Sequence, residues 1–186
     1  MRRQTIVALA GFCALTVTAA GQSQAAARRP AASLAARLQV LEDRAAIEDL
    51  LESYTAALDS SNWNAYADVF AKDGKLDWIG QTMNGREAIR SRMAQVVLAT
   101  PRRAGVAAPA GAGGAGRNPQ RHILSNIQIK VDGDHATTAA RWTLIVQLPD
   151  GKDAVDSTGR YADQLVRENG QWKFAHRIIS GDIPIS

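Results

Sequence analysis

The apolar residues of this chain change their spacing once, and this change limits the folds that the sequence can adopt. Between Leu34 and Leu58 they recur mostly every three or four residues, which is the spacing of an amphipathic helix. Similar spacing predicts a short second helix that begins at Trp63, buries Phe70 and is ended by Lys72-Asp73-Gly74, and a third helix over 86–98. From residue 121 onward, apolar and polar residues alternate, which predicts strands. Helices followed by strands indicate an α+β domain.

Four strands are predicted in the second half of the chain, over 121–131, 135–148, 157–167 and 171–180. The turns between them contain Asp-Gly or Asn-Gly pairs, and glycine accepts the positive φ angle that a tight hairpin needs. One further short strand, over 75–79, follows the second helix. The sequence therefore predicts a curved, mainly antiparallel sheet with three helices on one face.

The first 27 residues have the features of a secretory signal peptide. Arg2 and Arg3 form a short basic start, an uncharged apolar run follows, and Ala25 and Ala27 supply small residues in an A-x-A arrangement. Removal of residues 1–27 would lower the formal net charge from +4 to +2, because it deletes two arginines and no acid. We therefore expect a periplasmic or secreted protein.

Cys13 offers an alternative to cleavage at this point, because a lipoprotein would carry its lipid on such a cysteine. The bulky Phe12 before it does not fit the small-residue context of that signal. We therefore expect a mature domain over 28–186 that has no membrane attachment. Within it, residues 101–119 are rich in Ala, Gly and Pro, which predicts a flexible loop outside the core.

Composition excludes several functional classes. The single cysteine cannot form a disulfide framework or a Cys-rich zinc site. The pair Arg102-Arg103 is isolated, and no cluster of Lys and Arg could follow a phosphate backbone, so nucleic-acid binding is not expected. The three histidines lack the close spacing of a metal pair, and the motifs of nucleotide-binding loops and nucleophile elbows are absent. The sequence predicts no metal site.

Three stretches of the chain carry a resemblance to a known family. The segments RAAIEDLLESYTAALDSSNWNAYADVFAKDGKLDW, RHILSNIQIKV and YADQLVRENGQWKFAHR resemble the SnoaL-like branch of the superfamily named after nuclear transport factor 2, over about residues 38–181. Within this branch the chain is similar to scytalone dehydratase, hexachlorocyclohexane dehydrochlorinase and bile-acid 7α-dehydratase. The resemblance implies a cone-shaped α+β barrel, a pocket between sheet and helices, no metal or organic cofactor, and a homo-oligomer, either a trimer or a dimer.

The resemblance also implies a set of catalytic residues. The shared aspartate–histidine dyad of the group falls on Asp59 and His122. A tyrosine of the bile-acid enzyme falls on Tyr54, and an arginine of the dehydrochlorinase falls on Arg177. The chain departs from the group elsewhere, since scytalone dehydratase carries a second histidine where Val146 or Gln147 stands here. The dehydrochlorinase also has a lysine where this chain has the tyrosine, so the leaving group stays open.

The residues themselves leave alternatives for each position. Asp59 follows a helix whose dipole disfavours an anion, and an Asx-turn or a cap on the next helix would explain it equally well. His122 alternates with Leu124 and not with the isoleucines of its strand, which fits a pocket that is polar at one end, a β-bulge, or a partly exposed strand end. His176 competes with Arg177 for the position that faces the pocket. An apolar pocket lining is predicted for five residues that fit a plain core as well: Trp63, Phe70, Trp78, Met93 and Trp142.

These expectations favour a cofactor-independent lyase that eliminates water or another leaving group from a small hydrophobic, cyclic substrate. His122, oriented by Asp59, would remove a proton from carbon, while Tyr54 and Arg177 would stabilise the departing group or an enolate oxygen. A double-bond isomerase would use the same first step. A non-catalytic domain that binds a small ligand is the alternative from another class, because fold does not imply function.

Overall fold

The computed structural model describes residues 33–99, 120–148 and 150–182. The predicted signal peptide over 1–27 and the predicted loop over 101–119 lie outside the described residues. Nothing in the structure therefore tests either prediction.

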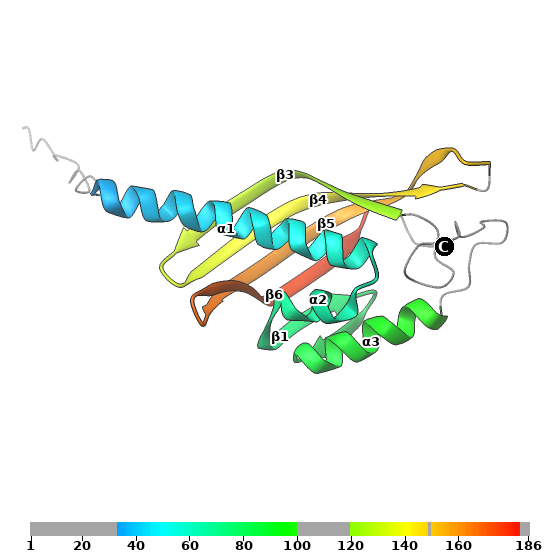
Figure 1. Ribbon diagram of the computed structural model, residues 1–186, viewed down its shortest axis with the longest axis horizontal. Helices are drawn as coiled ribbons and strands as arrows, with labels where there is room; N and C mark the ends of the chain where they lie inside the picture. The colour runs from blue at the N-terminus through cyan, green and yellow to red at the C-terminus, as the bar shows by residue number, and fades with distance from the viewer. Residues whose placement is uncertain (1–32, 100–119, 149, 183–186) are drawn as a thin grey trace, which may run out of the picture. The chain divides into compact units, whose positions relative to one another are not determined.

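Three helices precede most of the sheet (Figure 1). Helix α1 spans Leu34–Asp59 and α2 spans Trp63–Asp68, while α3 spans Arg86–Ala99. The side chain of Ser33 accepts a hydrogen bond from the backbone N–H of Ala36 and caps α1. Asn62 caps α2 in the same way. These caps satisfy N–H groups that have no partner inside a helix.

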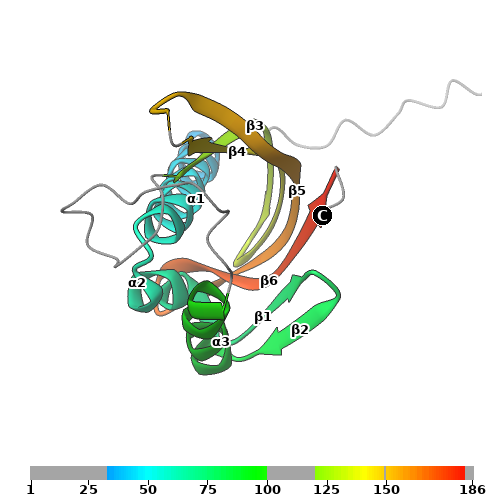
Figure 2. The ribbon, with the colours of Figure 1, turned by 90° about the vertical axis from the view of Figure 1, so that its right-hand side faces the viewer.

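Six strands form one sheet: β1 (Phe70–Trp78), β2 (Gln81–Asn84), β3 (Gln120–Asp132), β4 (His135–Gln147), β5 (Asp153–Glu168) and β6 (Gln171–Gly181). The strand order is β2-β1-β6-β5-β4-β3, and among these described strands β1 and β6 pair in parallel while all other neighbours pair antiparallel. The sheet curves around the helices, which lie on one of its faces (Figure 2). The predicted α+β class and helix-on-sheet architecture are therefore confirmed.

Two predictions about the first half of the chain are wrong in detail. The second helix ends at Asp68, and Phe70 begins β1 because its backbone pairs in parallel with Phe174 of β6. The sequence analysis did not predict strand β2. Its hairpin turns at Ile79 and Gly80, which both have positive φ angles. A β-branched residue such as Ile79 rarely adopts a positive φ angle. Because the turn reads Ile-Gly and not Asn-Gly or Asp-Gly, it lacks the usual sequence signal of a hairpin.

A bulge in β3 decides which of its side chains face the helices. The register shifts between Ser125 and Gln128, where Asn126 has a φ of 53°. Before the bulge Leu124 packs against the core and Ile123 is 46% exposed, whereas after it Ile129 is buried. The alternation therefore does not run unbroken along the strand. His122 and Leu124 consequently share the helix-covered face.

A second register shift acts on β6. It lies between the pairs Gln164–His176 and Leu165–Phe174, so Ala175 is an extra residue on β6. Arg177 is fully buried on the helix-covered face, whereas His176 turns to the opposite face. Of these two residues, the structure therefore places Arg177 on the inner side.

One apolar core joins α1, α2 and α3 to the inner face of the sheet. Its fully buried members include aromatic rings from four elements: Tyr54, Tyr66, Phe70 and Phe174. Gly159 of β5 lies opposite Trp142 of β4. A Cβ at Gly159 would overlap both the Trp142 indole and the carbonyl oxygen of Ser180, so only glycine leaves room for this ring.

We expect Gly159→Ala to lower the free energy of unfolding by about 1–3 kcal/mol, because the added methyl group overpacks the sheet. Urea unfolding followed by circular dichroism measures this loss. The matched control is Ala162→Ser, on the exposed face of the same strand, which should change stability by less than about 0.5 kcal/mol. Equal effects of the two substitutions would contradict the packing account.

Candidate active site

Asp59 and His122 meet where the end of α1 approaches the start of β3. Asp59 is the last residue of α1, and His122 is the third residue of β3. The Asp59 side chain neither caps α2, which Asn62 does, nor is used in a local turn. It reaches across to a residue 63 positions away in the sequence. The structure thus selects the contact with His122 over the local alternatives.

Both oxygens of the Asp59 carboxylate bind His122. Oδ1 lies 2.6 Å from Nδ1 of the imidazole, and Oδ2 accepts a hydrogen bond of 2.8 Å from the backbone N–H of His122. An ionised carboxylate only accepts, so the proton of the neutral ring lies on Nδ1. This tautomer leaves a lone pair on Nε2. The side chains are 10% exposed for His122 and 20% exposed for Asp59, so the pair is enclosed but reachable.

Trp142 of β4 lies next to this pair. The centroids of its indole and of the His122 imidazole are 6.2 Å apart, and the indole stacks on Tyr161 of β5 at 6.0 Å. The indole Nε1 is buried and has no hydrogen-bond partner among the described residues. A buried N–H without an acceptor costs about 1–3 kcal/mol. Nη1 of Arg177 is also buried without a partner among the described residues, but only the Trp142 ring contacts His122.

Arg177 lies deeper, at the centre of an aromatic cluster. Its guanidinium carbon lies 4.0 Å from the ring centroids of both Tyr54 and Phe174, and 4.2 Å from that of Tyr161. Its Nε and Nη2 donate to the two carboxylate oxygens of Asp163 at 2.7 and 2.8 Å. Both side chains of this ion pair are completely buried.

Burial sets the protonation states of this cluster. Desolvation raises the pKa of Tyr54, and it raises the pKa values of Tyr66 and Tyr161 well above the usual value. Burial alone would lower the pKa of Arg177, but the charge of Asp163 more than offsets this and raises it. The tyrosines therefore stay neutral and the arginine stays charged at physiological pH.

Comparison with known proteins places the chain in a family. A family model described as a SnoaL-like domain matches residues 39–178, which is most of the chain. The chain belongs to the SnoaL-like family. Its fold is that of the superfamily named after nuclear transport factor 2, and members of the SnoaL-like family include dehydratases and isomerases. A search of curated proteins found no match.

Solved structures agree with this fold. A protein of unknown function from Mycobacterium tuberculosis aligns with a TM-score of 0.64 at 21% identity, over 80% of this chain and 77% of that one. A nuclear transport factor 2-like protein with a cystatin-like fold from Novosphingobium aromaticivorans gives 0.64 at 23% identity, over 82% and 90%. A putative scytalone dehydratase from the same organism gives 0.59 at 23% identity, over 79% and 88%.

The other predicted residues of this SnoaL-like domain are placed around the core. Tyr54 is buried and its hydroxyl lies 2.9 Å from that of Tyr66. Among the described residues, no hydrogen bond joins Tyr54 or Arg177 to the dyad. Tyr54 is connected to His122 only indirectly, because its ring contacts Tyr161, which stacks on Trp142, which in turn contacts His122. Their catalytic roles stay predictions, and the structure gives both residues a packing role.

The five residues predicted to line an apolar pocket all belong to the core or pack against it. Phe70, Met93 and Trp142 are buried, while Trp63 and Trp78 are half-buried. Only Trp142 has a ring contact with His122. The structure therefore brings one of these five to the dyad.

Asp163 is the important residue that the sequence analysis missed. It lies between Tyr161 and Leu165 at the alternating positions of β5 that face the helices, and it accepts a further hydrogen bond from Thr138. An acid at a buried position of an alternating strand needs a charged partner. That pattern was the signal that could have found it.

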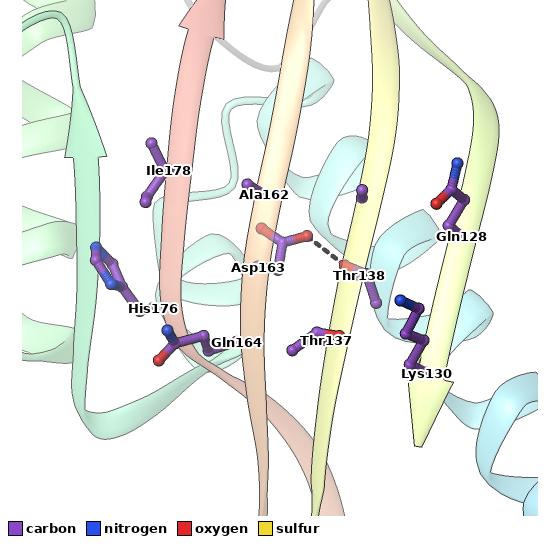
Figure 3. A pocket seen from close by; sticks show the side chains of 10 residues that line it. Gln128, Lys130, Thr137, Thr138, Ala162, Asp163, Gln164, His176 and Ile178 are labelled. Atoms are coloured by element: carbon purple, nitrogen blue, oxygen red, sulfur yellow. Dashed lines mark hydrogen bonds between the residues drawn. The ribbon is translucent and has the colours of Figure 1, made fainter. Parts of the chain in front are cut away.

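A second aspartate–histidine pair lies on the face of the sheet that the helices leave uncovered. His176 Nε2 is 2.7 Å from Asp77 Oδ2, and Thr82 donates to the other oxygen of Asp77. His176 lines a shallow hollow of about 340 Å³ together with polar side chains such as Gln164 and Lys130 (Figure 3). The hydrogen bonds from Thr82 and His176 lower the pKa of Asp77. This pair joins β1 to β6 and lies on the opposite face from the dyad.

Within the described residues, no group of three or more histidine, cysteine, aspartate or glutamate side chains is arranged to hold a metal ion. Over the same residues, no helix is long and apolar enough to cross a membrane.

We expect Asp163→Ala to cost about 3–5 kcal/mol of folding free energy, because it leaves the buried Arg177 charge uncompensated. The double variant Asp163→Leu/Arg177→Met should lose less folding free energy than Asp163→Ala, since both charges are removed together. Thermal unfolding of the three proteins tests this order. Arg141→Ala, which breaks an exposed pair with Asp182, is the control and should change stability by about 1 kcal/mol or less. A double variant no more stable than Asp163→Ala would refute the charge explanation.

Proposed function

We propose that this SnoaL-like protein is a cofactor-independent lyase that eliminates water from small cyclic compounds carrying a ketone and a hydroxyl group β to it. The hydrogen bond between Asp59 and His122 is the observation that carries the proposal. It leaves Nε2 of a largely buried imidazole free to accept a proton. A positioned base of this kind suits proton removal from carbon next to a carbonyl group.

In the proposed reaction, Nε2 of His122 takes the proton from the carbon between the carbonyl and the carbinol. The electron pair moves into the carbonyl to form an enolate, and Asp59 stabilises the imidazolium that results. The enolate then reforms its carbonyl and expels the β-hydroxyl group. That group leaves as water after taking a proton from His122, so the histidine serves as base and then as acid.

Trp142 supplies the donor that an enolate oxygen needs. Its Nε1 is buried and has no acceptor within residues 33–99, 120–148 and 150–182, and its ring lies beside His122. A donor that is held in place and has no competing partner can stabilise charge that develops in the transition state. In this proposal Trp142 takes over the oxygen-stabilising role first predicted for Tyr54 and Arg177. Those two residues support the wall of the site through Tyr161.

Two further observations bear on the class of reaction. The family includes dehydratases and isomerases, and one similar structure is named a putative scytalone dehydratase. Double-bond isomerisation shares the enolate and differs only in where the proton returns. A binding domain without catalysis would not need the carboxylate that orients His122, and this orientation favours the lyase.

We expect the protein to convert a β-tetralone that carries a hydroxyl group β to its ketone into β-naphthol, which is fluorescent. His122→Ala should lower the rate by roughly a hundredfold to ten-thousandfold, the usual contribution of a general base. Asp59→Asn should also lower it, because the imidazole loses its orientation. Circular dichroism should show unchanged folding in both variants.

His176→Ala removes the other paired histidine and should leave this rate unchanged, which makes it the matched control. Exchange of the protons next to the ketone in heavy water is the second readout, because it reports proton removal even for a ketone without a leaving group. If His122→Ala and Asp59→Asn both kept full dehydration and exchange activity, the lyase proposal would be wrong and a binding domain would be favoured.

Trp142→Phe keeps an aromatic ring and removes only the N–H group. We expect kcat/KM for the same tetralone to fall by about tenfold to a hundredfold, the worth of a hydrogen bond to a charged oxygen. Trp172→Phe is the control, because its indole N–H binds Asp43 at 3.3 Å and not a substrate. Trp172→Phe should lower the free energy of unfolding and leave kcat/KM unchanged. An unchanged kcat/KM in Trp142→Phe would remove Trp142 from the mechanism.

A further inference from the structure

The first turns of α1 expose leucines to an unusual degree. Leu34 is 80% exposed, Leu38 is 53% exposed and Leu41 is 63% exposed. Figure 1 shows this blue end of the helix extending past the turn between β3 and β4. Leucine is among the residues most often found inside proteins. Three exposed leucines along one side of a helix therefore indicate a surface that binds another molecule.

The spacing of this stripe is that of a coiled-coil seam. Leu34, Leu38, Leu41 and Ala45 are separated by four, three and four residues, as alternating d and a positions of a heptad are. At 3.6 residues per turn they lie on the side of α1 away from the buried residues such as Ile47 and Tyr54. A helix that packs on the seam would therefore not collide with the sheet of its own domain.

Charged residues on the two flanks of the seam select a partner. Arg37 lies on one flank and Glu42 on the other, and neither pairs with a described residue. In a parallel coiled coil, a g position of one helix lies against the e position five residues later in the other helix. Arg37 and Glu42 hold these two positions. The seam is therefore complementary to a second copy of itself in parallel orientation.

The seam also has a defined end. The next two positions of the heptad are Glu48 and Glu52, both exposed, and like charges at a and d positions repel. A contact between two copies would stop at Ala45, about three turns from where it starts. Such a short seam makes an association that is reversible and depends on concentration.

We propose that the Leu34–Ala45 segment of α1 docks in parallel against the same segment of a second copy of this chain. Sedimentation equilibrium of the purified protein should show a monomer–dimer equilibrium. Leu38→Asp should raise the dissociation constant at least tenfold, because it places a charge in the seam. Val155→Asp is the control, since Val155 is 61% exposed on the sheet and lies outside the seam. It should leave the constant unchanged.

Charge reversal tests orientation and partner together. Arg37→Glu should weaken association by roughly tenfold, since two like-charge pairs replace two opposite ones. Combining it with Glu42→Arg should restore the original constant. Replacing Glu48 and Glu52 together with leucine should extend the seam and tighten association. Rescue by the double charge reversal is not expected of a merely structural effect on α1.

Several results would overturn this inference. A protein that is monomeric at all concentrations would show that the seam does not join two copies of the chain. Association lost in Val155→Asp but not in Leu38→Asp would place the interface on the sheet. Binding to anionic vesicles that Leu38→Asp abolishes, without self-association, would assign the stripe to a membrane surface. The dyad lies at the other end of α1, so none of these results depends on the lyase proposal.

Discussion

The buried ion pair between Arg177 and Asp163 is the interaction on which the inner side of the sheet depends. Neither charge could be buried alone, because removal from water costs each of them several kcal/mol. The carboxylate takes two hydrogen bonds from the guanidinium, and the faces of Tyr54, Tyr161 and Phe174 surround the cation. This pair therefore fixes the aromatic wall of the core on β5 and β6. Tyr161 in turn holds Trp142 against the dyad.

The sequence predicted the order of the elements more reliably than the direction of their side chains. The helical spacing of α1 and the Asp-Gly and Asn-Gly turns of the second half depend on local chemistry, and both predictions agree with the structure. The face on which His122 and Arg177 lie depends on two irregularities, at Asn126 and at Ala175. Strict alternation cannot locate an extra residue, because a bulge is decided by the pairing of two distant strands.

The candidate site shows the same division. Asp59 and His122 were named from a resemblance, and their contact spans 63 positions of the sequence that no local pattern connects. The partner of Arg177 was missed, although the position of Asp163 on an alternating strand indicated a buried acid. Trp142 was predicted only to line an apolar pocket or to belong to the core. That its N–H has no acceptor in the part of the chain that the structure describes depends on the packing of several strands, which no sequence pattern predicts.

The position of Asp59 explains why the dyad forms where it does. A carboxylate at the C-terminus of a helix faces the negative end of the helix dipole, which disfavours it by up to about 1 kcal/mol. Two donors from His122, one from the backbone and one from the ring, offset this cost. The backbone donor holds the carboxylate in place whatever the charge of the imidazole. The orientation of the ring therefore does not depend on the charge of the imidazole, which is what the proposed role of His122 as base and then acid requires.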